Sequence, residues 1–258
     1  MGHIVSPADY PVNIDNGWNW IGVNTASVIS SDEAFANLDP EEGDMVKGLE
    51  GFSTYVNNRW RGTLNTITPG NGYLYLSQAS RQKTFCYPAI TTISGGNRIP
   101  ARPAGSSFSP VDSRKYPNNM TMVAEVHYEG VVLSQGEVAV YVDGECRYAS
   151  DYADEEALRY LTIPGQGGGA VEIYVEHDGQ LYTTDVVETY ADNKTVGTVA
   201  SPLIIQLGEP TSIERINAGE TTHDGNIYDL TGRKVDERYL KTRPSKGVYI
   251  QNSKKIVR

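Results

Sequence analysis

Four aromatic side chains are the strongest candidates for ligand contact in this 258-residue sequence. Trp18 and Trp20 are separated by one residue, so in a β-strand their side chains project from the same face. Trp60 and Tyr73 belong to the same stretch of chain. On an exposed face such rings form a platform that stacks on sugar rings. In a small domain poor in Phe and Leu they also serve as core, and the sequence alone favours the core interpretation.

No pattern of polar residues predicts a catalytic or metal centre. The histidines have no metal-ligand partner at helical or hairpin spacing: His3, His127, His177 and His223. The sequence contains no nucleophile elbow, zinc-protease motif or phosphate-binding loop. A glycosidase-like pair of carboxylates needs a cleft, which small β-sandwiches rarely provide. We therefore expect a non-enzymatic protein with no catalytic residue, cofactor or metal.

Two further groups of side chains have both a chemical and a structural interpretation. An acidic run could supply oxygen ligands to calcium, but it lacks the alternating spacing and central glycine of calcium loops, so we expect a solvated loop: Asp151, Asp154, Glu155 and Glu156. The two cysteines, Cys86 and Cys146, lack zinc-ligand spacing. We expect free thiols, with a disulfide in an oxidising compartment as the alternative.

Charge is unevenly distributed along the chain. The net charge is −10, but residues 212–258 contain ten Lys and Arg against six Asp and Glu, which leaves residues 1–211 with a net charge of −14. An acidic body repels phosphate backbones, so we expect no nucleic-acid partner. No run of 18 apolar residues occurs, so no transmembrane helix is predicted. The basic tail indicates a separate unit.

Composition and patterning predict an all-β fold, because β-favouring Tyr, Val, Ile and Thr alternate with turn-forming Gly, Pro, Asn and Ser. Residues 1–100 form an N-terminal β module, with strands expected at 17–23, 44–47, 51–56, 59–64, 73–76 and 83–87. Ser30, followed three residues later by Glu33, fits a capping box and predicts one short helix over residues 30–38. Asn57-Asn58 predicts a hairpin turn.

The rest of the chain divides into three segments. Residues 101–119 are rich in Gly, Pro, Ser and Asn and are predicted to be a linker. Residues 120–210 show six or seven short strands, with hairpin dipeptides at Asp143-Gly144 and Asp178-Gly179, which is typical of an immunoglobulin-like β-sandwich. Residues 211–258 predict a small unit of two hairpins that turn at Thr231-Gly232 and Asn252-Ser253.

The last unit resembles the C-terminal sorting domain of the type IX (Por) secretion system. The family pattern is an aromatic-Asp-x-x-Gly-Arg strand, then a Lys-Gly-(Val/Ile)-Tyr strand, then a basic strand at the extreme C-terminus. The residues that carry the resemblance are Tyr228, Asp229, Gly232, Arg233, Lys246, Gly247, Tyr249, Lys254 and Lys255. The resemblance implies secretion or anchoring machinery as a partner, and an extracellular or outer-membrane surface location.

These observations together predict a non-enzymatic secreted or cell-surface protein. The C-terminal unit is expected to serve export or anchoring. The upstream β modules are expected to serve adhesion or ligand recognition, with a surface glycan or another protein as the partner. The alternative is a carbohydrate-binding accessory module of a larger secreted glycan-degrading protein.

Overall fold

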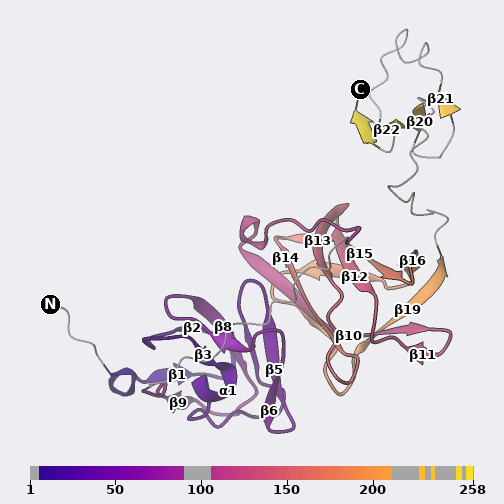
Figure 1. Cartoon of the computed structure of the whole chain (residues 1–258). Helices are drawn as coiled ribbons and strands as arrows, with labels where there is room; N and C mark the ends of the chain where they lie inside the picture. Colours follow the sequence, from indigo (N-terminus) through magenta and orange to yellow (C-terminus); the bar gives the residue numbers. More distant parts are fainter. Residues whose placement is uncertain are drawn as a thin grey trace. The chain divides into compact units, whose positions relative to one another are not determined.

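The computed structural model describes residues 6–89 and 106–210, and the backbone of four short strands between residues 227 and 257 (Figure 1). The described residues are mainly β, with one short α-helix and two 3₁₀-helices, Pro7–Asp9 and Ser113–Lys115. This confirms the all-β prediction. The chain divides into two compact units, residues 1–212 and residues 213–258.

The N-terminal module is built on a five-stranded antiparallel sheet. Its strand order is β2 (Gly17–Gly22), β8 (Gly72–Ser77), β4 (Met45–Lys47), β5 (Phe52–Val56) and β6 (Arg59–Gly62). Two further strand pairs complete the module: β1 (Val12–Ile14) with β9 (Lys83–Phe85), and β3 (Ile29–Ser30) with β7 (Thr66–Ile67). The six predicted strands are confirmed, whereas the short β1, β3 and β7 carry no periodic signal in the sequence.

The predicted helix is present but shorter than expected. The helix α1 spans Ser31–Ala34 and has the predicted capping box, in which the Ser30 hydroxyl accepts from the Glu33 N–H and the Glu33 carboxylate accepts from the Ser30 N–H. Turns follow it. Phe35 nevertheless lies in the core, where its ring centroid is 5.3 Å from that of Trp60.

The predicted hairpin turns are confirmed by their backbone angles. Asn57 and Asn58 both have positive φ, 54° and 60°, as the type I′ turn between β5 and β6 requires. Asp143-Gly144 has φ values of 50° and 75°, and Asp178-Gly179 has 51° and 75°. Asn, Asp and Gly tolerate this left-handed region, and for that reason these dipeptides fix the strand ends.

The central module is a curled sheet that closes into a sandwich-like body. Its strands are β10 (Asn118–Tyr128), β11 (Val131–Val132), β12 (Glu137–Val142), β13 (Glu145–Ser150), β14 (Arg159–Gly165), β15 (Gly168–His177), β16 (Gln180–Thr184), β17 (Glu188–Ala191), β18 (Thr195–Val196) and β19 (Leu203–Pro210). β10 pairs with β14 on one side and, in parallel, with β18 and β19 on the other. β19 also pairs with β16, and this pairing links the two layers.

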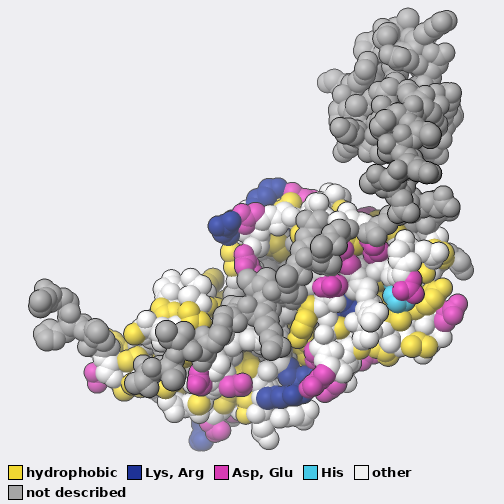
Figure 2. Space-filling view, in the orientation of Figure 1, with side chains coloured by type: hydrophobic (Ala, Val, Ile, Leu, Met, Phe, Trp, Pro, Cys, Tyr) yellow, Lys and Arg dark blue, Asp and Glu magenta, His cyan; other side chains and the backbone are white. Residues whose placement is uncertain are grey.

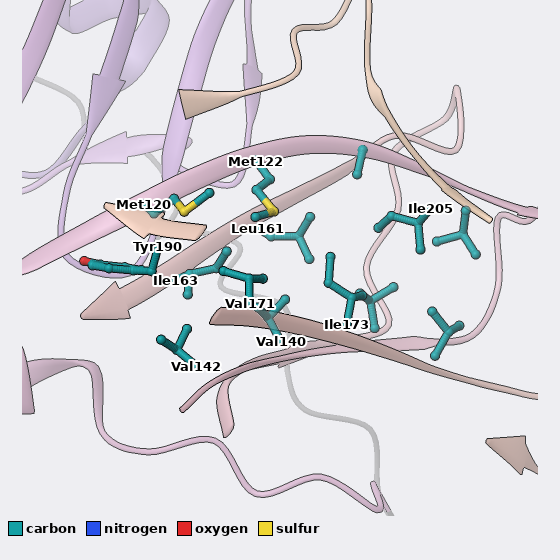
Figure 3. Packing of buried hydrophobic residues seen from close by; sticks show 14 of the residues in the cluster. Met120, Met122, Val140, Val142, Leu161, Ile163, Val171, Ile173, Tyr190 and Ile205 are labelled. Atoms are coloured by element: carbon teal, nitrogen blue, oxygen red, sulfur yellow. The ribbon is translucent and has the colours of Figure 1, made fainter. Parts of the chain in front are cut away.

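The core of this module follows the period of two that its sequence predicts. Alternate residues of facing strands are buried together, as Figure 3 shows, and they include Met120, Met122, Val140, Val142, Leu161, Ile163, Val171, Ile173, Tyr190 and Ile205. Because successive side chains of a strand point to opposite faces, one face of each strand supplies the core.

One buried cation ties the loops of this module together. Arg159, on β14, is 1% exposed, and burial lowers its pKa. Its guanidinium donates to backbone carbonyl groups at 2.9–3.4 Å, those of Leu133, Gly136, Asp151 and Tyr152. Hydrogen bonds to several carbonyls offset the cost of burying its charge.

The N-terminal and central modules share a hydrophobic cluster. Met45 and Phe52 come from the N-terminal sheet, and Val123, Leu158 and Tyr160 come from the central module. Since Met122 and Ala124 point into the sandwich core, β10 is buried on both faces.

The described part of the predicted linker lies against the sandwich. Phe108 packs with Ala139 and Cys146, and the Val111 N–H donates to the Cys146 carbonyl. Cys146 is buried, Cys86 is half-buried, and both are free thiols, as predicted.

The C-terminal unit contains a four-stranded antiparallel sheet. The strands β20 (Ile227–Asp229), β21 (Lys234–Val235), β22 (Val248–Gln251) and β23 (Lys254–Val257) lie in the order β21-β20-β22-β23. Both predicted hairpins are therefore confirmed, and β20 and β22 join them.

Candidate functional site

The N-terminal sheet has one face that packs into the module core and one face that is only half covered. Ile21, Val46, Tyr73 and Tyr75 point into the module core. On the opposite face two rows of paired residues cross the sheet: Trp18, Leu76 and Met45, and Trp20, Leu74 and Lys47. The central module covers this face at β4 and β5, where Met45 and Phe52 join the shared cluster. The part formed by β2 and β8 is only partly covered: Leu76 packs against the shared cluster, whereas Trp18 and Trp20 are exposed.

This partly covered region forms an aromatic shelf, which we define as Trp18, Trp20, Leu74 and Leu76. Trp20 is 78% exposed and Trp18 is 37% exposed, while both leucines are half-buried. The core interpretation favoured by the sequence is therefore wrong for these two tryptophans. The alternation of residue types shows that the two tryptophans share a face. Whether that face is covered depends on the central module, which lies far from both tryptophans in the sequence.

Trp60 and Tyr73 lie elsewhere. Trp60 is half-buried, and its ring packs against those of Phe35, Tyr55 and Tyr75. Tyr73 is 3% exposed and belongs to the module core. The structure thus keeps two of the four candidate residues on one exposed surface and places the other two in or against the core.

A buried lysine supports the shelf. Lys47 is 2% exposed, and its Nζ lies 4.9 Å from the centroid of the Trp18 ring, within the range of a cation–π contact. The same Nζ donates to Asn193 Oδ1 at 2.8 Å and to the Asn119 carbonyl at 3.3 Å. Burial lowers the pKa of Lys47 to about 8, against the opposing effect of the Asp192 carboxylate. Lys47 therefore holds Trp18 and the central module together.

A cavity of about 180 Å³ adjoins the shelf at the seam between the modules. Trp20, Leu74 and Lys47 line it from the N-terminal sheet; Pro117, Asn118, Asn119 and Asn193 line it from the central module. Asn193 occupies the turn between β17 and β18 with a φ of 61°. No signal in the sequence points to the three asparagines. Asn118 and Asn119 begin β10 and Asn193 lies in the turn after β17, and only the fold brings these two places beside β2.

Two amide groups in the cavity wall have free hydrogen-bonding capacity. Asn118 Nδ2 donates to Asp192 Oδ2 at 3.0 Å, and Asn193 Oδ1 accepts from Lys47. In the part of the chain that the structure describes, Asn118 Oδ1 and Asn193 Nδ2 have no hydrogen-bond partner. The cavity therefore offers one acceptor and one donor beside an exposed indole.

The acidic run lies in a loop in which Asp151, Glu155 and Glu156 are exposed, as the sequence predicts, but Asp154 is 13% exposed and the run makes ion pairs that the sequence does not show. Asp154 accepts from Arg61 of β6 at 2.6 Å, Glu156 pairs with Arg61 at 2.9 Å, and Glu155 pairs with Arg59 at 2.9 Å. Burial alone would raise the pKa of Asp154, but hydrogen bonds from Arg61 and from the Leu158 and Glu156 N–H groups lower it. Asp154, Glu155 and Glu156 therefore form an ionic clamp between the two modules.

No metal-binding cluster of three or more His, Cys, Asp or Glu side chains occurs within residues 6–89 and 106–210. His127 Nε2 lies 2.9 Å from Glu125, and His177 Nε2 lies 3.4 Å from Asp178. These are single pairs of neighbouring residues.

The sorting-motif residues are described in part. Tyr228 and Asp229 lie in β20, Tyr249 in β22, and Lys254 and Lys255 in β23. In the strand register Asp229 is opposite Tyr249, and Lys255 is opposite Ile250. The other motif positions lie outside the described residues: Gly232, Arg233, Lys246 and Gly247.

The chain matches no protein-family model, no curated protein and no solved structure. Among the described residues, no helix combines the length and the apolar character that crossing a bilayer requires. The geometry of the shelf and its cavity is therefore the basis for a functional proposal.

Proposed function

We propose that this chain is a non-enzymatic recognition protein of a bacterial cell surface. Its aromatic shelf binds a glycan, and its C-terminal unit serves export or anchoring. The observation that carries the proposal is the exposure of Trp18 and Trp20 on the part of the sheet that the central module covers only partly.

Two exposed indoles on one strand are uncommon, since large apolar side chains are usually buried where a protein can bury them. Trp18 and Trp20 sit on one face of β2, about 7 Å apart by the rise of a β-strand. A flat surface of this kind suits a ligand with apolar ring faces and polar edges, which is the character of a sugar chain. The cation–π contact of Lys47 holds Trp18, and the core side of β2 holds the strand in place, so both limit the conformational entropy lost on binding.

Trp20→Ala tests the recognition part of the proposal. Because Trp20 is 78% exposed, its removal should leave the fold intact while it deletes the larger part of the shelf. We expect the wild-type chain to bind glycans on an array, and Trp20→Ala to bind them at least about tenfold more weakly, the effect of losing about 1.4 kcal/mol.

The matched control is Tyr10→Ala, which removes another exposed aromatic side chain, one that is 55% exposed and lies outside the shelf. This variant should bind like the wild type. An array without hits for the wild-type chain would sink the proposed glycan recognition.

The export part rests on the resemblance of residues 227–258 to sorting domains and on their basic composition. The chain should be expressed behind a signal peptide in a bacterium that has the type IX machinery, with and without residues 227–258. We expect surface labelling of intact cells for the full chain, and retention in the periplasm for the shortened one. Equal labelling of both would contradict an export role.

A further inference from the structure

We propose that the glycan site is composite: a neutral pyranose residue stacks on Trp20, and two adjacent hydroxyls bind Asn118 and Asn193 of the other module. This inference rests on the proposed function and specifies the ligand class. It also makes the seam between the modules, and not the N-terminal module alone, the unit of recognition.

The cavity has a floor and a wall that come from different parts of the sequence. Trp20 and Leu74 form the floor, and they are opposite one another in the β2–β8 register. Asn118, at the start of β10, and Asn193, in the turn after β17, form the wall. A ring lying flat on Trp20 therefore presents its edge to the two amides.

The free atoms of the wall match a pair of hydroxyls. Asn118 Oδ1 accepts and Asn193 Nδ2 donates, while each sugar hydroxyl does both. Two neighbouring hydroxyls satisfy both amide atoms at once. Asn119, which is 5% exposed, lines the same cavity, and its Nδ2 donates to the Gly48 carbonyl at 2.8 Å. Unpaired polar atoms beside an apolar floor are the arrangement that fixes ligand orientation in binding pockets.

The charged side chains around the cavity, Lys47 and Asp192, already have hydrogen-bond partners within the protein, and this favours an uncharged ligand. Lys47 Nζ donates to two carbonyl oxygens. The Asp192 carboxylate accepts from Asn118 Nδ2 at 3.0 Å and from the Gly167 N–H at 3.2 Å. Acidic side chains are spread over the face that Figure 2 shows, and residues 1–211 carry a net charge of −14, so uronate or sulfate groups are repelled.

The experiment uses the full chain and two variants with substitutions in the cavity. An array holding neutral hexose oligosaccharides beside uronate-containing and sulfated glycans identifies the ligands. The neutral oligosaccharide with the strongest signal is then titrated by calorimetry. Asn193→Asp keeps the acceptor for Lys47 and the tolerance for positive φ, but it replaces the donor with a carboxylate oxygen. We expect binding at least about tenfold weaker, because the wall loses the one hydrogen-bond donor that it offers to a sugar oxygen.

Gly72→Ile tests the cavity without touching its polar groups. A Cβ at Gly72 meets no atom within 4 Å, and Gly72 lies on the shelf face beside the Trp20–Leu74 row. The isoleucine side chain suits a strand, fills the space beside Trp20, and should abolish binding with the thermal midpoint maintained. The matched control for Asn193→Asp is Asn13→Asp. It makes the same amide-to-acid change on β1 and keeps the acceptor for the Thr84 hydroxyl.

The outcomes separate this inference from the broader proposal. If Trp20→Ala loses binding but Asn193→Asp and Gly72→Ile bind like the wild type, the composite site is overturned and glycan recognition by the shelf stands. Hits confined to uronate-containing or sulfated glycans would overturn the neutral ligand class. An array with no hits would overturn both the composite site and the broader proposal that the shelf binds a glycan.

Discussion

Lys47 holds a positive charge in a position that is almost closed to water. Its Nζ has two carbonyl acceptors and an aromatic ring, but no carboxylate within hydrogen-bonding distance among the described residues. Neutral acceptors compensate a buried charge less well than a carboxylate does, and desolvation accordingly favours the uncharged amine. Lys47 therefore contacts the Trp18 ring at a cost in folding free energy that depends on pH.

The pH dependence of stability tests this description of Lys47. Its pKa falls from 10.5 to about 8 on folding, so the folded state binds the proton more weakly than the unfolded state does. Below pH 8 the free energy of unfolding carries the full cost of burying the charged Lys47. As the pH rises toward 10.5 this cost is relieved, and the free energy of unfolding increases by up to about 3 kcal/mol. Urea titrations of the wild type and of Lys47→Met at pH 7.5 and pH 10 should show the wild type gaining stability relative to the variant. A difference that does not change with pH would refute the buried charge.

At the scale of single elements, the β5–β6 hairpin depends on one glycine. Gly62 has a φ of 147°, and a Cβ there would lie 2.2 Å from the Phe52 carbonyl oxygen and 2.7 Å from Ser53 Cα. Because both obstacles are backbone atoms, they cannot yield without parting the strands. We expect Gly62→Ala to lower the free energy of unfolding by about 2–5 kcal/mol.

The comparison for this prediction is Gly72→Ala. This glycine lies in β8 with open space around it and an ordinary φ, so alanine should leave stability unchanged or raise it by up to about 1 kcal/mol. Denaturant titration of the two variants provides the measurement. Similar stabilities for both would mean that β5 and β6 do not approach as closely as described.

The elements differ in how far the sequence determines them. The turns at Asn57-Asn58, Asp143-Gly144 and Asp178-Gly179 were predictable, because positive φ is a local requirement that few residue types meet. The capping box at Ser30 is equally local. The parallel pairing of β10 with β19 joins residues about 80 positions apart, and alternation does not encode it. The exposure of Trp18 and Trp20 depends on another long-range arrangement, the packing of the central module against β4 and β5.

At the scale of the whole molecule, residues 1–212 behave as one unit although the sequence divides them into two modules. The modules share the cluster around Phe52 and Tyr160, whose ring centroids are 5.8 Å apart. Arg61 adds ion pairs with side chains across the seam, and its own side chain is 5% exposed. The composite site needs this rigidity, because a seam that opens would separate Trp20 from Asn193.

Arg61→Met tests whether the ionic clamp makes unfolding cooperative. Removing the guanidinium leaves Asp154, which is 13% exposed, without its cation, so we expect a loss of about 3 kcal/mol. All three tryptophans lie in the N-terminal module, so their fluorescence reports that module and its side of the seam. Far-UV circular dichroism reports both modules when it is measured on residues 1–212, which leaves out the C-terminal sheet. The two signals should give one transition in the wild type and separate transitions in Arg61→Met.

The control is Arg114→Met, which removes an exposed ion pair with Asp112 and should change the free energy of unfolding by less than about 0.5 kcal/mol. Separate transitions in the wild type would show that the seam does not couple the modules, and a composite site could then not form.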